Sequence, residues 1–181
     1  MRLIEDLHPD DTIARDQLAT RLVQARALAG LTQRQLGDRL GVDFHAVYNL
    51  ERGRRWLARR AQAWARGLDL RLDLRMQGLE VPDDDNALAA LYAAQQPMTA
   101  GAEDRLALRE LFNDLARVRR GQHVWQKEMG RRMGLGPTRV SQQEAEPDGA
   151  LLLTAQRYTR ALGGVLLLDL VPVMVPELEA A

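Results

Sequence analysis

Apolar residues recur every three to four positions over much of the chain, which is the spacing of an amphipathic helix. The first such stretch, residues 12–29, places Leu18, Leu22, Ala25 and Ala29 on one face. Shorter helices are predicted over residues 33–40, 44–52 and about 56–68. The residues expected to pack them together are Leu36, Leu40, Val47 and Leu50.

The capping and turn residues between these helices fit the same pattern. Thr32 with Gln35 three residues later forms a capping box that begins a helix. Gly41 suits the tight turn that follows, and Asp43 can cap the next helix. Two short helices joined by a glycine turn are therefore expected to cross at a steep angle.

Two segments have the pattern of strands instead. Residues 70–76 alternate strictly between apolar and polar, which predicts a half-buried strand. Residues 165–171 are apolar on both faces, so that strand is expected to be covered on both. The predicted fold is therefore mainly α, with two four-helix units, each followed by a β-strand.

An internal repeat supports the two units. Residues 18–51 align with residues 111–144 at an offset of 93, and one inserted residue raises the later offset to 94. The identical pairs include Leu18 with Leu111, Leu22 with Leu115, Arg26 with Arg119, Gln33 with Gln126, Gly37 with Gly130, Gly41 with Gly134, Val47 with Val140, Glu51 with Glu144, Ala61 with Ala155, Arg66 with Arg160 and Leu74 with Leu168. Trp64 aligns with Tyr158.

The repeat divides the chain into four parts. The first unit is residues 1–76 and the second, more divergent unit is residues 104–173, joined by an acidic linker over 77–103. A short helix is expected within the linker, over 86–95, because aspartates precede it. Residues 174–181 form a tail interrupted by proline, which is expected to fray.

The net charge is zero, but the charges are unevenly placed. Residues 15–75 carry 13 basic and 6 acidic side chains, and residues 105–170 carry 11 and 7. Both units are therefore locally positive, as phosphate binding requires.

Several classes of protein are excluded or disfavoured. The chain has no cysteine, so disulfides and thiolate metal sites are excluded. Its three histidines lack metal-ligand spacing, no cofactor is expected, and no catalytic or nucleotide-binding motif is found. Trp56, Trp64 and Tyr158 are expected in the core, and Glu51 and Glu144 are expected to anchor helices. We find no signal peptide and no membrane-spanning run, which predicts a cytoplasmic protein that is not an enzyme.

The segment Leu31–Gly53, LTQRQLGDRLGVDFHAVYNLERG, resembles the helix-turn-helix of the lambda-repressor/Cro-like superfamily, also called the xenobiotic-response-element family. The matching features are Thr-Gln at the start of the first short helix, leucines four apart, Gly-Val at the turn and Leu-Glu near the end. The second unit resembles this family less closely. The resemblance implies that the outer face of residues 44–52 enters a major groove of double-stranded DNA.

The resemblance also implies roles for individual residues. In the first unit, base edges would be contacted by Phe44, His45 and Asn49, with asparagine suited to adenine. Phosphates would be held by Gln33, Arg34, Arg52, Arg54 and Arg55. The equivalents in the second unit are Gln126 and Lys127 for phosphates, and Thr138, Arg139 and Gln142 for bases.

Three departures distinguish the second unit: Trp125 replaces Thr32, Gln143 replaces Leu50, and an acidic stretch over 144–148 replaces the basic loop. We predict a transcriptional regulator, a repressor of bacterial, phage or plasmid origin. One alternative is an antitoxin-like autoregulator whose second unit binds a protein, and another is a scaffold protein. The two strands are expected to pair antiparallel about a pseudo-twofold axis, or between two chains of a homodimer.

Overall fold

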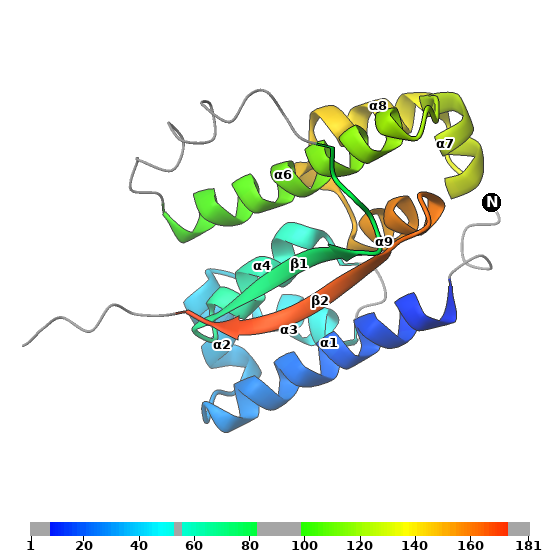
Figure 1. Cartoon of the computed structure of the whole chain (residues 1–181). Coiled ribbons are helices and arrows are strands. Elements are labelled where there is room, and N and C mark those ends of the chain that lie inside the picture. The colour runs from blue at the N-terminus through cyan, green and yellow to red at the C-terminus, as the bar shows by residue number, and fades with distance from the viewer. Residues whose placement is uncertain (1–7, 53–55, 83–98, 174–181) are drawn as a thin grey trace, which may run out of the picture.

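The computed structural model describes residues 8–52, 56–82 and 99–173, and the structural statements below refer to these residues (Figure 1). The predicted linker helix over 86–95, Arg54, Arg55 and the tail lie outside them. The elements of the first unit are α1 (Pro9–Leu28), α2 (Gln33–Leu40), α3 (Phe44–Arg52), α4 (Ala58–Arg66) and β1 (Leu70–Gln77). Those that follow are α6 (Ala100–Gly121), α7 (Gln126–Met133), α8 (Pro137–Ala145), the 3-10 turn η1 (Pro147–Gly149), α9 (Leu152–Ala161) and β2 (Val165–Pro172).

Helices α2 and α3 have the predicted bounds, whereas α1 and α4 differ from prediction at their starts. Helix α1 begins three residues early because Pro9 occupies its first turn and the His8 side chain accepts a hydrogen bond from the Asp10 N–H. Helix α4 begins late, at Ala58, because the Trp56 carbonyl bonds to Leu152 N, 3.0 Å away. Long-range backbone pairing therefore replaces the expected first turn.

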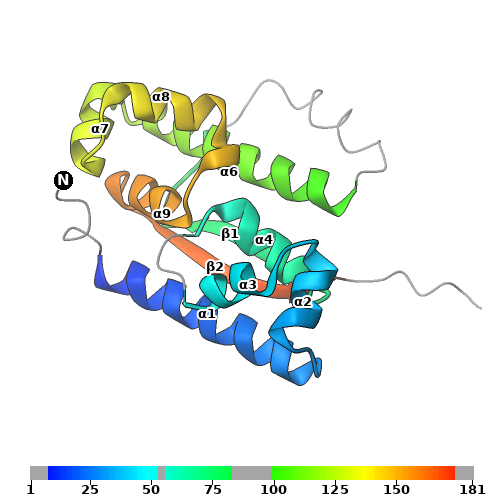
Figure 2. The ribbon, with the colours of Figure 1, turned by 180° about the vertical axis from the view of Figure 1, so that it is seen from behind.

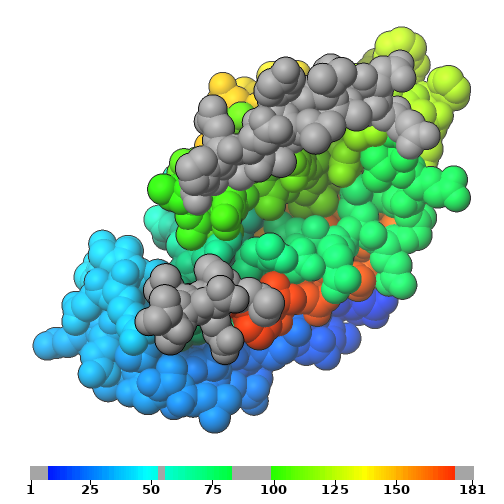
Figure 3. Space-filling model, turned by 60° about the vertical axis from the view of Figure 1, so that its left-hand side comes forward, coloured from blue at the N-terminus to red at the C-terminus, as the bar shows by residue number. Residues whose placement is uncertain are grey.

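The predicted pairing of the two strands within one chain is confirmed. β1 and β2 form a two-stranded antiparallel sheet in which Leu70 lies opposite Pro172 and Gln77 opposite Val165. The strands cross the centre of the molecule, with α6 on one side and α1 on the other (Figure 1). Figure 3 shows β1 and β2 side by side at the surface between the blue α1–α2 block and green α6.

The expectation that β2 is covered on both faces is wrong. Leu166 and Leu168 are 1% and 5% exposed, but Val165 and Leu167 on the other face are only half-buried. α1 lies over β2 with an open groove between them, lined in part by Ile13 and Leu167. The face of β2 that carries Val165 and Leu167 is therefore only partly covered.

One hydrophobic core runs through both units. Trp56, Trp64 and Tyr158 are buried in it, as expected. The aromatic contact differs between the units, because Trp64 packs edge-on against Trp56 whereas Tyr158 packs edge-on against Phe112. The aromatic partner thus comes from the segment before α4 in the first unit and from α6 in the second.

The contacts between the two units recur at aligned positions. Leu57 forms an isolated antiparallel bridge with Leu151, and these residues are equivalent at the offset of 94. Around this bridge, Ala58 N bonds to Ala150 O at 2.9 Å, and the matching bond runs from Leu152 N to Trp56 O. Each of these contacts therefore has a counterpart at the aligned positions, in which the first-unit and second-unit residues have swapped roles.

The polar contacts between the units also occur in pairs at aligned positions. Arg66 Nη2 on α4 binds Asp104 Oδ1 on α6 at 2.9 Å, and Arg160 Nε on α9 binds Asp11 Oδ1 on α1 at 3.0 Å. Gln62 and Gln156 donate to the backbone carbonyls of these same aspartates, at 2.9 and 3.0 Å. Both glutamines are nearly inaccessible to solvent, so these contacts belong to the buried interface between the units.

Candidate nucleic-acid interface

Helices α2 and α3 are joined by a turn that the sequence specifies closely. Thr32 Oγ1 accepts the Gln35 N–H at 3.2 Å, and Gln35 Oε1 accepts the Thr32 N–H at 2.8 Å, which completes the predicted capping box. Gly41 ends α2 with φ +65°, and Asp43 Oδ1 accepts the Ala46 N–H at the start of α3. Local hydrogen bonds therefore fix both ends of the turn.

Gly37 determines how closely the two helices approach. A Cβ atom on Gly37 would lie 2.7 Å from the carbonyl oxygen of Val42, closer than side-chain carbons are found. Leu36 and Val47 are fully buried beneath this contact. The turn thus positions α3 with its outer face away from the core.

Glu51, near the end of α3, connects this helix with α1 and α2. Its carboxylate accepts hydrogen bonds from Arg26 Nε of α1 and Gln33 Nε2 of α2, each at 2.6 Å. Arg26 also donates to the Leu31 carbonyl at 2.7 Å. The Arg26 and Glu51 side chains are only 15% and 10% exposed, so this is a buried, hydrogen-bonded ion pair that anchors the helices as expected.

The Gln33 amide therefore faces Glu51. Gln33 was predicted to hold a phosphate, and the structure gives its side chain an internal partner instead, in a half-buried position. The other predicted residues of the first unit that the structure describes are exposed: Arg34, Phe44, His45, Asn49 and Arg52. Apart from Arg34 on α2, they project from α3.

Two aromatic rings on α3 make cation–π contacts with arginine side chains. The guanidinium of Arg34 lies 5.9 Å from the centre of the Phe44 ring, and that of Arg52 lies 4.9 Å from the Tyr48 ring. Arg52 also donates to the Tyr48 hydroxyl. Sequence reasoning missed Tyr48, although its spacing of four residues from Arg52 is a usable signal for a pair on one helix face.

The residues 22–74 match a protein-family model, HTH_3, described as Helix-turn-helix. The first unit contains a helix-turn-helix domain. The match spans the later part of α1, all of α2, α3 and α4, and most of β1, and it does not extend into the second unit. No curated protein and no solved structure matches the chain.

The second unit has a local geometry close to that of the helix-turn-helix domain. Gly134 ends α7 with φ +66°, where Gly41 has +65°. A Cβ atom on Gly130 would lie 2.6 Å from the Leu135 carbonyl oxygen, as close a contact as that at Gly37. α7 and α8 are therefore joined by a turn of the same kind as α2 and α3.

Glu144 has the same partners as Glu51, with one addition. Arg119 Nε and Gln126 Nε2 donate to its carboxylate at 2.8 and 2.9 Å, and the Tyr158 hydroxyl also donates to it. Burial acts to raise the pKa of Glu144, but the bonds from Arg119, Tyr158 and Gln126 outweigh it and hold the pKa below its ordinary value. Burial and the neighbouring Glu144 carboxylate raise the pKa of Tyr158.

The departures predicted for the second unit have structural consequences. Trp125 precedes α7 without a side-chain cap and is 82% exposed. Gln143, in place of Leu50, has a buried Oε1 atom without a hydrogen-bond partner. Gln126 is engaged by Glu144, whereas the predicted contact residues Lys127, Thr138, Arg139 and Gln142 are exposed.

Helices α3 and α8 lie on one side of the molecule. In Figure 2 both are in front, and the sheet and α6 are behind them. In the opposite view of Figure 1, the sheet and α6 are in front. Both helices therefore lie on the side of the molecule opposite α6.

Two other features were looked for in the described residues. No cluster of histidine, aspartate and glutamate side chains there is arranged to hold a metal ion. Nor is any of the described helices both long and apolar enough to cross a bilayer.

Proposed function

We propose that this protein is a sequence-specific, double-stranded DNA-binding transcriptional regulator, and specifically a repressor of bacterial, phage or plasmid origin. The observation that carries the proposal is the exposed outer face of α3, held on a scaffold by the buried Glu51 contacts. A recognition helix needs this combination, because its side chains must reach base edges while the helix keeps a fixed orientation. A repressor of this kind acts by covering a promoter.

The exposed residues divide by chemistry into two groups. Asn49 is suited to the bidentate contact with adenine, and Phe44 to a thymine methyl group, with His45 as donor or acceptor beside them. Phosphates would be contacted by Arg34 and Arg52, together with Arg54 and Arg55, which lie outside the described residues. Because Glu51 already accepts from Gln33, we assign Gln33 to the scaffold and expect at most a shared phosphate contact.

We also propose that the second unit is a diverged helix-turn-helix, and that the two units form a single-chain counterpart of a helix-turn-helix dimer. Its support is the set of contacts that recur when the units are exchanged, from the Leu57–Leu151 bridge to the Arg66 and Arg160 ion pairs. In the second unit, Thr138, Arg139 and Gln142 would face bases, and Lys127 a phosphate.

Selection of bound sites from random duplex DNA tests this function. The intact chain should enrich one motif, and the Asn49→Ala variant should lose preference at one base pair of that motif. Arg59→Ala is a suitable control, because Arg59 is exposed on α4, outside the proposed contact face. Failure to enrich any motif would contradict the proposal.

A second candidate function rests on Trp125. An exposed tryptophan at the start of α7, where the first unit has the capping Thr32, is a common anchor for a protein partner. The chain would then be an antitoxin-like autoregulator that binds DNA through the first unit and a protein through the second. Lys127→Ala and Arg139→Ala distinguish the candidates: both should weaken DNA binding if the second unit contacts DNA, and neither should if it binds only protein.

A further inference from the structure

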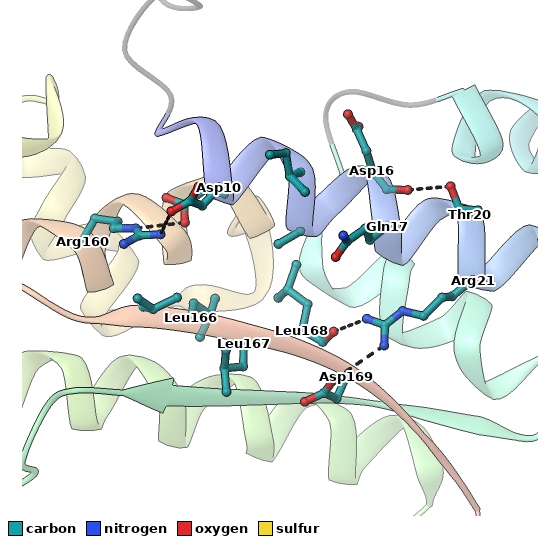
Figure 4. A pocket seen from close by; sticks show the side chains of 14 residues that line it. Asp10, Asp16, Gln17, Thr20, Arg21, Arg160, Leu166, Leu167, Leu168 and Asp169 are labelled. Atoms are coloured by element: carbon teal, nitrogen blue, oxygen red, sulfur yellow. Dashed lines mark hydrogen bonds and ion pairs between the residues drawn. The ribbon is translucent and has the colours of Figure 1, made fainter.

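Arg52 on α3 is positioned in a different way from an arginine in the groove beside α1. In that groove, Arg21 lies 3.6 Å from a carboxylate oxygen of Asp169, so the two charges compensate each other (Figure 4). Arg52 instead donates from Nη1 to the Tyr48 hydroxyl, and its guanidinium lies 4.9 Å from the centre of the Tyr48 ring. A neutral aromatic side chain attracts a guanidinium but leaves its positive charge in place.

The charge of Arg52 is uncompensated within the described residues. No carboxylate among them lies within ion-pair distance of this guanidinium, and both Tyr48 and Arg52 are exposed. We infer that Tyr48 is a positioning residue, which holds the Arg52 guanidinium ready for a phosphate of the DNA backbone. The inference rests on the DNA-binding function proposed above, where Tyr48 has no role.

The Tyr48 contacts reduce the freedom that Arg52 loses when it binds a phosphate. A free arginine side chain samples many rotamers and must give up this freedom on binding. A guanidinium has several N–H donors, and the bond from Nη1 to Tyr48 leaves others for a phosphate oxygen. Tyr48 is therefore expected to strengthen the phosphate contact that Arg52 makes.

The positions of these residues on α3 separate them from the proposed base contacts. Phe44, Tyr48 and Arg52 follow one another at intervals of four residues, so they lie in one row along the helix. His45 and Asn49 are also four residues apart and lie in the next row. Removing the Tyr48 ring should consequently leave the residues that read bases in place.

The pair of Tyr48 and Arg52 occurs in the first unit only. At the offset of 93, the aligned residues on α8 are Ser141 and Ala145, both exposed. Neither a serine nor an alanine can form an equivalent contact between a ring and a guanidinium. The inference therefore assigns this contribution to α3 alone and gives a further reason to expect that the first unit dominates binding.

The test is a double-mutant cycle on the intact chain, with affinity measured for the selected duplex and for an unrelated duplex of equal length. Tyr48→Ala should weaken binding to both duplexes by about three- to tenfold, because a phosphate contact does not depend on sequence. Tyr48→Phe keeps the ring but loses the hydroxyl, so its loss should be smaller. In an Arg52→Ala background, Tyr48→Ala should have no further effect, since the side chain that it positions is gone.

Arg59→Ala provides the matched control background, because Arg59 is an exposed arginine on α4, outside the proposed contact face. There, Tyr48→Ala should weaken binding by the same factor as in the natural protein. An equal loss in the Arg52→Ala background would mean that Tyr48 acts only through the fold of α3, and tighter binding by Tyr48→Ala would mean that Tyr48 withholds Arg52 from DNA. Either result would overturn the inference while the proposed function stands. A natural protein that bound no duplex would instead contradict the proposed function itself.

Discussion

Leu74 lies directly opposite Leu168 in the sheet, and the internal alignment makes these two residues equivalent. Leu57 and Leu151 stand in the same relation at the start of α4 and α9. Two pairs of equivalent residues in mutual contact define a local axis, about which the other contacts between the units are exchanged. The arrangement supports our proposal that the two units of this chain correspond to the two protomers of a helix-turn-helix dimer.

The first prediction separates base contacts from phosphate contacts on α3. Asn49→Ala should cost about 1–3 kcal/mol of binding free energy at the selected site and relax the preference at one base pair. Arg52→Ala should weaken binding to all sequences about equally and reduce the slope of log affinity against log salt by about 1. Titrations of matched and mutated sites at several salt concentrations give both quantities.

The same titrations rank the two units. We expect the first unit to dominate, because the second has Gln143 in its packing position and acidic residues after α8. If Gln142→Ala abolished specific binding while Asn49→Ala left it intact, the ranking of the units would have to be reversed.

The second prediction concerns the buried carboxylate of the second unit. Glu144→Gln leaves the Arg119 guanidinium, 9% exposed, without its counter-charge and should lower the free energy of unfolding by about 3 kcal/mol. The folded-state pKa of Glu144 is lowered, so its contribution is complete above the ordinary value of 4.5 and is lost as the pH falls.

Thermal unfolding across pH measures this effect. The gap between the natural protein and Glu144→Gln should be widest above about pH 6 and shrink as the solution becomes more acidic. Glu146→Gln, at an exposed position in the following turn, should unfold like the natural protein throughout. A gap that widens on acidification would contradict the assigned contacts.

The third prediction concerns the glycines within α2 and α7. Gly37→Ala and Gly130→Ala each place a carbon within 3 Å of a backbone carbonyl oxygen, so each should destabilise the protein by about 1–3 kcal/mol despite the better helix propensity of alanine. Gly101→Ala, on an exposed turn of α6 with only a flexible arginine at 4.0 Å, should be neutral or stabilising. Equal stability of all three variants by chemical denaturation would refute the close helix contact.

Much of this fold could be predicted because local signals agree with long-range packing. The Thr32 capping box and Gly41 set α2 at the predicted bounds, and the alternation over 70–76 predicted β1. The structural roles of Glu51 and Glu144 were also expected from their aligned places. These features depend on neighbours within a few residues or on a clear periodicity.

What the sequence could not show depends on contacts between distant segments. The late start of α4 results from pairing between Trp56 and Leu152, almost a hundred residues apart. Leu167 of β2 lines an open groove beside α1, and Gln33 donates to Glu51, which the fold brings to it from the end of α3. Tyr48 was missed because an aromatic residue in a helix usually packs inward, whereas this one holds Arg52 at the surface.

The most direct test of the account is footprinting of the intact chain on spacing variants of its selected site. The proposed recognition helices, α3 and α8, should contact successive major grooves, so the site should be bipartite, with half-site centres about 10 base pairs apart. It should also be asymmetric, because His45 and Asn49 on α3 differ from Arg139 and Gln142 on α8. Inserting about five base pairs between the halves turns one half to the opposite face of the duplex, so binding should drop steeply. A perfect palindrome, or binding that is indifferent to the half-turn insertion, would contradict the single-chain pair of units.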